Sequence, residues 1–232
     1  MRICKRGLAS ENSVVPLCGV GAYSRSHNDD STERNQRMSI LLLAGSPSER
    51  SRSAALLDAV AARLAGRGIT IERLHIRDLS PQALLLADTG HRSIAVAADL
   101  VQRSRAIVIA TPVYKAAYSG VLKVFLDLLP QTALKNKVVL PLATGGSPHH
   151  MLALDYALRP VLQSLSARHI LPGVYATDSQ VTLLPEGGHH ITADVGARLD
   201  EAVNGLVQEA HRGAPVSAAF DTVPFLQVRC SV

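Results

Sequence analysis

One stretch, residues 39–53 (SILLLAGSPSERSRS), limits most strongly what this chain can fold into. It opens with the uncharged apolar run 40–44, which is typical of a parallel strand buried on both faces. Gly45 ends the run, and a loop rich in Ser and Arg precedes a helical pattern of apolar residues. This order predicts an anion site, because a helix N-terminus presents unpaired N–H groups. An ordinary turn with Ser caps also fits the pattern.

Two common phosphate-binding loops are excluded by the sequence of this stretch. It lacks G-x-x-x-x-G-K-[ST], the loop of nucleoside triphosphatases, and it lacks the G-x-G-x-x-G of dinucleotide-binding proteins. What remains is a loop in which Ser hydroxyls surround the anion. In this respect it resembles the loop with which flavodoxin-like proteins hold the terminal phosphate of FMN.

Strands and helices alternate along the chain after this stretch. We expect strands at 69–76, 105–110, 137–143 and 170–176. Helices are expected at 51–67, 93–104, 149–167 and 191–211, with a kink at Pro160. A further helix is expected to follow a loop at 113–119 and to end at residue 129. Thr111 and Pro112 are expected to end the third strand, and 183–190 is expected to be a loop. Such alternation predicts an α/β fold, a flavodoxin-like three-layer sandwich around a five-stranded parallel sheet of order 2-1-3-4-5. Its ligand would lie at the carboxyl ends of strands one, three and four.

Composition narrows the partners and the compartment. The formal net charge of +5 suits anionic cofactors but is spread along the chain, so we expect no nucleic-acid partner. No apolar run is long enough to span a membrane. The three cysteines, Cys4, Cys18 and Cys230, lie near the termini without metal-site or disulfide spacing, which favours the cytoplasm and predicts no metal site.

Three parts of the chain are expected. Residues 1–37 lack sustained periodicity and are interpreted as a disordered extension, or as the product of an upstream start codon, with the functional protein beginning at Met38. Residues 38–212 form the flavodoxin-like domain, and residues 213–232 a loose tail.

Three segments, LLLAGSPSERSRSAALL, IVIATPVYKAAYSGVLKVFLDLLP and KVVLPLATGGSPHHMLALDYALRPVL, resemble the NADPH-dependent FMN reductases. They are most similar to the sulfonate-linked, SsuE-type group, and the resemblance covers about residues 38–212. It implies FMN and NADPH as ligands, a homodimer or homotetramer, and a flavin-dependent monooxygenase that receives reduced FMN for alkanesulfonate utilisation.

The resemblance also implies site residues. Ser46, Ser51 and Ser53 would cradle the FMN phosphate together with Ser48 and Arg52; because many relatives carry Arg where this chain has Ser48, the cation would come from Arg50 or Arg52. Further along, the ribityl chain and flavin edge would be lined by Pro112, Val113 and Tyr114. The pyrimidine end of the flavin would be approached by Thr144, Gly145, Gly146 and Ser147.

Tyr118 is expected at the start of the third helix, where an aromatic ring could stack on flavin or cross a subunit interface, or simply pack. In the sulfonate-linked group an aromatic at this place is associated with a locally distorted helix and the oligomer contact. Lys115 could attract the phosphate of NADPH or lie in solvent. Asp155 and Tyr156 are interpreted as packed helix-face residues.

The sequence therefore predicts an enzyme that transfers hydride from NADPH to FMN. No catalytic acid or base is expected, because the two rings react when stacked and the protein supplies binding and orientation. Two alternatives stay open: an FMN-bound quinone or azo-dye reductase, and a flavodoxin-type electron carrier. The absence of Trp and the net positive charge disfavour the carrier.

Overall fold

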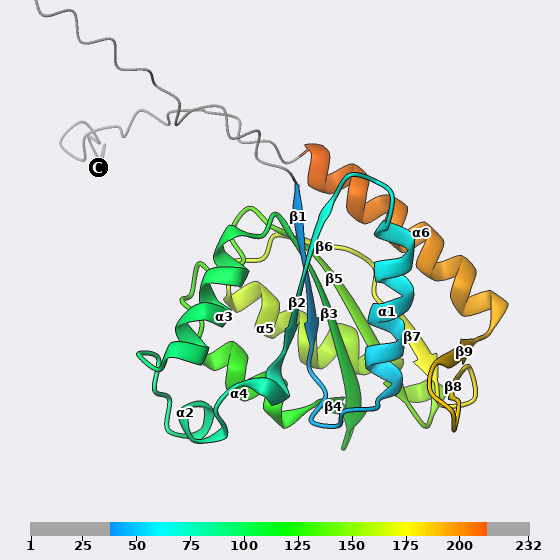
Figure 1. Cartoon of the computed structure of the whole chain (residues 1–232), viewed down its shortest axis with the longest axis horizontal. Helices are drawn as coiled ribbons and strands as arrows, with labels where there is room; N and C mark the ends of the chain where they lie inside the picture. Colours follow the sequence, from blue (N-terminus) through cyan, green and yellow to red (C-terminus); the bar gives the residue numbers. More distant parts are fainter. Residues whose placement is uncertain (1–37, 213–232) are drawn as a thin grey trace, which may run out of the picture. The chain divides into compact units, whose positions relative to one another are not determined.

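The computed structural model describes residues 38–212 of the 232-residue chain. The extension expected at 1–37 and the tail expected at 213–232 lie outside the described residues. Strands and helices alternate as predicted (Figure 1). The elements are β1 (Ser39–Ala44), α1 (Arg52–Leu64), β2 (Thr70–His75), the 3₁₀ helix η1 (Ile76–Asp78), α2 (Pro81–Leu85), α3 (Arg92–Arg103), β3 (Ala106–Tyr114), β4 (Ala117–Tyr118), α4 (Gly120–Asp127), β5 (Val138–Gly145), the 3₁₀ helix η2 (Pro148–Met151), the π-helix η3 (Leu154–Leu158), α5 (Arg159–Ser164), β6 (His169–Ile170), β7 (Val174–Thr177), β8 (Val181–Leu183), β9 (His189–Ile191) and α6 (Ala193–Arg212).

The central sheet confirms the predicted order. Its parallel strands run β2-β1-β3-β5-β6, and β7 continues the last position by pairing with the far end of β5. The break between β6 and β7 covers residues 171–173, which include Pro172 and Gly173, where the predicted fifth strand had been continuous. The sheet contains seven strands when β4 and β7 are counted, but its five parallel positions are those of the flavodoxin-like fold.

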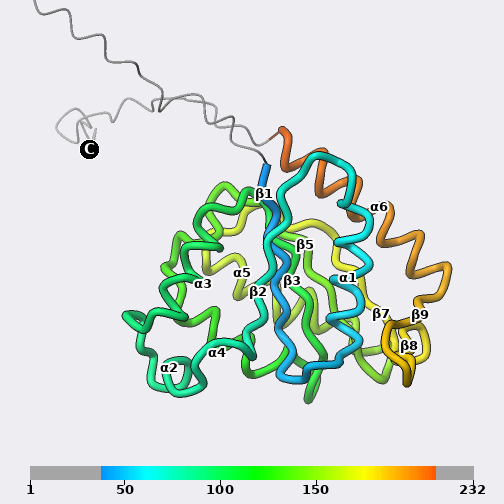
Figure 2. Tube along the Cα trace, viewed as in Figure 1, coloured from blue at the N-terminus to red at the C-terminus, as the bar shows by residue number. Residues whose placement is uncertain are grey.

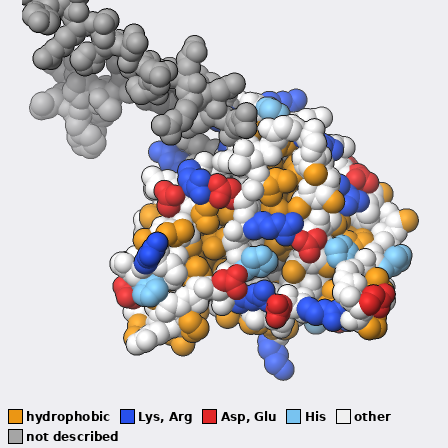
Figure 3. Space-filling view, in the orientation of Figure 1, with side chains coloured by type: hydrophobic (Ala, Val, Ile, Leu, Met, Phe, Trp, Pro, Cys, Tyr) orange, Lys and Arg blue, Asp and Glu red, His pale blue; other side chains and the backbone are white. Residues whose placement is uncertain are grey.

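Two aliphatic cores make the three layers. On one face of the sheet, α1 and α6 pack on alternate residues of β1, β3 and β5; on the other face α3, α4 and α5 cover the intervening residues (Figures 1 and 2). Leu42 and Leu43, adjacent in β1, therefore belong to different cores, as expected for a strand covered on both faces. No helix within residues 38–212 combines the length and apolarity needed to cross a membrane. On the face seen in Figure 3, cationic and anionic side chains are interspersed.

A β-hairpin replaces the predicted end of strand three. β3 continues past Pro112 to Tyr114 and pairs with β4 in antiparallel fashion, so Thr111 and Pro112 do not end it and 113–119 is not a loop. The turn is made by Lys115 and Ala116, which have φ of 50° and 64°. Positive φ at both central residues is the geometry of two-residue hairpins, which usually take Asn-Gly or Gly-Gly. Lys-Ala gives no such signal in the sequence.

The helix predicted at 149–167 is divided into η2, η3 and α5. Pro160 cannot donate a backbone hydrogen bond, and the preceding N–H, of Arg159, reaches back to the carbonyl of Leu154, which is a π-type bond. The predicted kink at Pro160 is thus a π-helix on the N-terminal side of the proline.

The predicted fourth strand, β5, is longer than expected. It extends to Gly145, so Thr144 and Gly145 belong to the strand and not to the loop after it.

The strained turn of the hairpin leads to a first prediction. Replacing Ala116 with Gly is expected to stabilise the protein by about 0.5–1 kcal/mol, because Gly adopts positive φ without steric strain. For a domain of this size the melting temperature should rise by roughly 1–4 °C.

The matched control is Ala197→Gly on the exposed surface of α6. There the same substitution should lower stability by about 1 kcal/mol, because Gly is a poor helix former. Thermal melts of both variants that move in the same direction would contradict the assigned turn strain.

Candidate functional site

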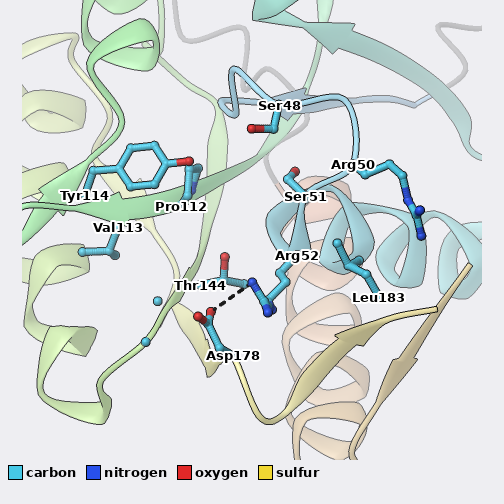
Figure 4. A pocket seen from close by; sticks show the side chains of 12 residues that line it. Ser48, Arg50, Ser51, Arg52, Pro112, Val113, Tyr114, Thr144, Asp178 and Leu183 are labelled. Atoms are coloured by element: carbon cyan, nitrogen blue, oxygen red, sulfur yellow. Dashed lines mark ion pairs between the residues drawn. The ribbon is translucent and has the colours of Figure 1, made fainter. Parts of the chain in front are cut away.

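A pocket of about 230 Å³ opens at the carboxyl ends of β1, β3 and β5 (Figure 4). Parallel strands bring these ends to one edge of the sheet, where the sequence placed the candidate site. The lining residues are Ser48, Arg50, Ser51, Arg52, Pro112, Val113, Tyr114, Thr144, Gly145, Gly146, Asp178 and Leu183.

The first wall is the loop between β1 and α1. Gly45 suits this position because a Cβ would be tightly packed there, 3.1 Å from both the Ala110 carbonyl oxygen and Leu122 Cβ. The Ser46 hydroxyl accepts a hydrogen bond from Ser48 N–H at 3.1 Å and thereby tightens the loop. Ser51 then caps α1, its hydroxyl oxygen accepting from Ala54 N–H at 3.1 Å. The loop therefore directs the N-terminus of α1 at the pocket.

This first wall is suited to an anion. The initial N–H groups of α1 have no intrahelical acceptor and carry the positive end of the helix dipole. Because the Ser51 oxygen is engaged as an acceptor in the cap, its own hydrogen can be donated to a ligand. Ser48 adds a second hydroxyl, and Arg50 and Arg52 add cationic charge at the pocket.

The second wall is the end of β3, held in place by Ser119. This buried residue caps α4, with its hydroxyl oxygen accepting from Leu122 N–H at 3.3 Å. The same hydroxyl donates to the Gly45 carbonyl, while Ser119 N–H donates to the Thr111 hydroxyl at 3.0 Å. One side chain thus ties the β3–β4 hairpin to the anion loop.

The third wall is the end of β5, where Gly145 allows a close approach. A Cβ on Gly145 would lie 2.7 Å from the Tyr175 hydroxyl, which donates to the Ser147 carbonyl at 2.6 Å. Burial, and secondarily the nearby charge of Asp178, raises the pKa of Tyr175. The phenol therefore stays protonated, as its role as a donor requires.

A fourth wall was not expected from the sequence. Residues 181–191 form the β8–β9 hairpin beside the anion loop, where a loop was predicted at 183–190, and Asp178 lies in the turn that leads into it. Arg50 donates to the Leu184 carbonyl, and Arg52 Nε donates to the Val181 carbonyl at 3.0 Å. Arg52 also pairs with Asp178 at 3.6 Å (Figure 4). The Pro- and Gly-containing segment 185–188 indicates a turn, but the flanking segments 181–183 and 189–191 are too short to be recognised as strands.

A family model described as NADPH-dependent FMN reductase matches residues 38–182. The chain belongs to this family. FMN reductase (NADPH) of Escherichia coli K12 is 44% identical over 178 residues, covering 75% of this chain and 91% of that protein. FMN reductase (NADPH) of Pseudomonas putida is 46% identical over 144 residues, covering 62% of this chain and 73% of that protein. The crystal structure of EMOB, an NADH:FMN oxidoreductase in its apo form, has a TM-score of 0.65 and 41% identity, covering 73% of this chain and 88% of that chain.

Membership of the NADPH-dependent FMN reductases confirms the predicted class of enzyme, an oxidoreductase, and its two predicted ligands, FMN and NADPH. The residues present fit FMN. A phosphate requires hydroxyl donors, a helix N-terminus and cations, and these converge in the first wall. A flat ring can approach a backbone that carries no side chains, and Gly145 and Gly146 line the pocket.

Most of the residues predicted for the FMN site line the pocket. The exceptions are Ser46, Ser53 and Ser147. Ser46 and Ser53 are buried, 4% and 1% exposed, and Ser53 lies with its hydroxyl 3.3 Å from that of Ser51. They support the loop from behind. Asp178 and Leu183 line the pocket and were missed, while Arg50, named as an alternative cation, does line it.

Tyr118 does not lie where it was predicted. It belongs to β4, paired with Val113, and precedes the Ser119 cap, so it is not in the third helix and does not line the pocket. Burial raises its pKa. The helix that follows Tyr118, α4, is a regular α-helix, so the local distortion that the resemblance associated with this place is absent there; the π-helix is η3, which packs against β4. Tyr156 lies within η3 and is 79% exposed, so it is not packed in the subunit as predicted.

Proposed function

We propose that this enzyme reduces free FMN with NADPH and releases the reduced flavin to a flavin-dependent monooxygenase, in alkanesulfonate utilisation. The observation that carries the proposal is the anion loop: hydroxyls, two arginines and a helix N-terminus at the carboxyl edge of a flavodoxin-like sheet. All pocket residues lie within 38–212, the domain to which we assign the activity.

In this proposal each wall of the pocket has a part in binding. Ser48, Ser51 and Arg52 hold the phosphate, with Ser46 and Ser53 shaping their loop. Pro112, Val113 and Tyr114 line the ribityl chain and flavin edge. The pyrimidine end meets Thr144, Gly145 and Gly146, and Ser147 anchors Tyr175 behind them.

When bound, FMN would supply the redox chemistry, as a hydride acceptor that gains negative charge on its pyrimidine side. The chain needs only to orient the ring and stabilise that charge. The glycines of the third wall leave room for the backbone to come close, and no side chain has to move a proton. Lys115, exposed at the hairpin turn beside Tyr114, is placed to attract the phosphate of NADPH.

Release of the flavin is supported by the size of the pocket. Its volume of about 230 Å³ is below the ~300–1,000 Å³ of pockets that enclose most of a drug-sized ligand. Tyr114 is the single aromatic residue among those that line it, whereas an electron carrier would enclose the ring between aromatics. Both features favour a flavin that enters and leaves.

The experiment is to purify the protein, record its absorbance, and assay NADPH oxidation with and without added FMN. We expect a colourless protein whose NADPH oxidation depends on FMN, and reduced FMN that passes through an ultrafiltration membrane under anaerobic conditions. A yellow protein with one retained FMN, active on quinone without added flavin, would instead support the quinone or azo-dye reductase.

We further propose a cytoplasmic homodimer or homotetramer. On α4, which follows Tyr118, the side chains of Leu122, Phe125 and Leu126 are buried in the subunit, and the other apolar residues of this segment, Val121, Val124 and Leu128, are partly buried. Large exposed apolar side chains gather instead on η2 and η3: Met151 and Leu152 are each 55% exposed, beside Tyr156. Such a group favours a subunit contact.

Replacing Tyr156 with Ser is expected to lower the mass measured by light scattering, because it removes the largest apolar side chain of this surface. Leu85→Ser, on the equally exposed surface of α2, is the matched control and should keep the parental mass. If Tyr156→Ser also keeps it, the contact lies elsewhere.

A further inference from the structure

Asp178 is the single carboxylate among the residues that line the pocket. It directly follows β7, and its N–H donates to the Gly145 carbonyl at 3.1 Å, which fixes it to the third wall. Its Oδ1 lies 3.6 Å from a guanidinium nitrogen of Arg52, and Figure 4 shows the two side chains turned toward each other. A negative charge thus stands in a pocket whose other charged groups suit an anion.

The ion pair with Asp178 reduces the positive charge that Arg52 can present to a phosphate. Its Nε already donates to the Val181 carbonyl, and its terminal nitrogen faces Asp178. A guanidinium held by a carboxylate contributes less charge to a neighbouring phosphate, and the carboxylate itself repels a phosphate within several ångströms. Asp178 therefore acts on the anion site both through Arg52 and directly.

We propose that Asp178 is a positioning residue that holds the Arg52 guanidinium back from the FMN phosphate and so keeps FMN affinity low enough for rapid exchange. This inference rests on the proposed function, in which FMN is a released substrate. It gives a physical reason why a loop with two arginines and a helix N-terminus does not retain the flavin.

A purely structural role for the carboxylate is disfavoured by its exposure. The side chains of Asp178 and Arg52 are 47% and 41% exposed, and ion pairs this exposed add little to stability. The backbone bond to Gly145 does not depend on the side chain. Asp178→Asn should therefore fold with a parental melting temperature and remove only the charge.

The test is a titration of FMN into the parent, Asp178→Asn and Asp178→Glu, at low and high salt, with riboflavin alongside. We expect Asp178→Asn to bind FMN about 3–10-fold more tightly at low salt, with the gain shrinking at high salt and riboflavin affinity unchanged. Asp178→Glu should restore the parental value. In turnover with NADPH, the KM for FMN of Asp178→Asn should fall together with kcat, because release of the product slows.

A double-mutant cycle tests the route through Arg52. In an Arg52→Gln background, Asp178→Asn should tighten FMN clearly less than it does in the parent. Unchanged or weaker FMN binding in Asp178→Asn, or equal tightening of FMN and riboflavin, would overturn the inference. Since the readout is affinity, it is separate from the proposed function, which would fail if the parent did not oxidise NADPH in the presence of FMN.

Discussion

Replacing Ser51 with Asp is expected to weaken FMN binding roughly 30- to 1,000-fold, through repulsion between the new carboxylate and the phosphate at a few ångströms. The helix should survive the change. Ser51 caps α1, and Asp is as good an N-cap as Ser and is favoured by the helix dipole. The measurement is FMN affinity by titration, with a thermal melt of the same sample.

Ser80→Asp is the matched control, because Ser80 caps α2 in the same way, accepting from Ala83 N–H at 3.3 Å, and does not line the pocket. It should bind FMN like the parent. Riboflavin, which lacks the phosphate, should bind parent and Ser51→Asp alike. An equal loss for FMN and riboflavin would show that Ser51 shapes the pocket without facing the phosphate.

Replacing Gly145 with Ala is expected to lower kcat/KM for FMN about 10–100-fold and to destabilise the fold by roughly 1–3 kcal/mol. The new methyl group would lie 2.7 Å from the Tyr175 hydroxyl and 3.3 Å from Val113 Cβ. The ring cannot retreat without losing its 2.6 Å hydrogen bond to the Ser147 carbonyl. Steady-state kinetics with varied FMN and a thermal melt measure the two effects.

Two further variants isolate the clash. Gly146→Ala should keep a melting temperature close to that of the parent, because the nearest protein atom to its Cβ, Asp178 Oδ2, lies at an ordinary contact distance of 3.7 Å. Tyr175→Phe removes the clashing atom, so the double variant with Gly145→Ala should recover part of the loss relative to Tyr175→Phe alone. If Gly146→Ala destabilises the fold as much as Gly145→Ala, the clash with Tyr175 is not the cause of the loss.

The sheet could be predicted because its strands are apolar runs that recur between helical patterns. The order of the strands followed from the anion loop after the first of them, and that loop, the end of β3 and the end of β5 do meet in one pocket. The sequence was misleading where a local backbone geometry is formed by residues that rarely adopt it. Lys115 and Ala116 form a turn that Asn-Gly usually forms, so the sequence did not indicate a hairpin there. Tyr118 was therefore predicted in a helix instead of a strand.

Asp178 and Leu183 were missed for another reason. Leu183 reaches the pocket on the β8–β9 hairpin, whose strands have three residues each, too short to show a periodicity, and Asp178 lies in the turn between β7 and β8. Their positions depend on long-range bonds, from Arg50 and Arg52 to carbonyls of the hairpin and from Asp178 N–H to the Gly145 carbonyl, and single-sequence patterns carry no information about such contacts. The π-helix η3 was expected only as a kink, because Pro160 shows where a regular helix fails but not how the backbone adjusts.

The central claim is that the loop between β1 and α1 recognises FMN by its phosphate, and one measurement tests it most directly. It is the kcat/KM of the parent enzyme for FMN and for riboflavin, at fixed NADPH, with FAD as a third acceptor. Because two or three charge-assisted hydrogen bonds to the phosphate would each contribute about 1.5–3 kcal/mol, FMN should exceed riboflavin by roughly 100-fold or more. Equal kcat/KM values for FMN and riboflavin would contradict the account.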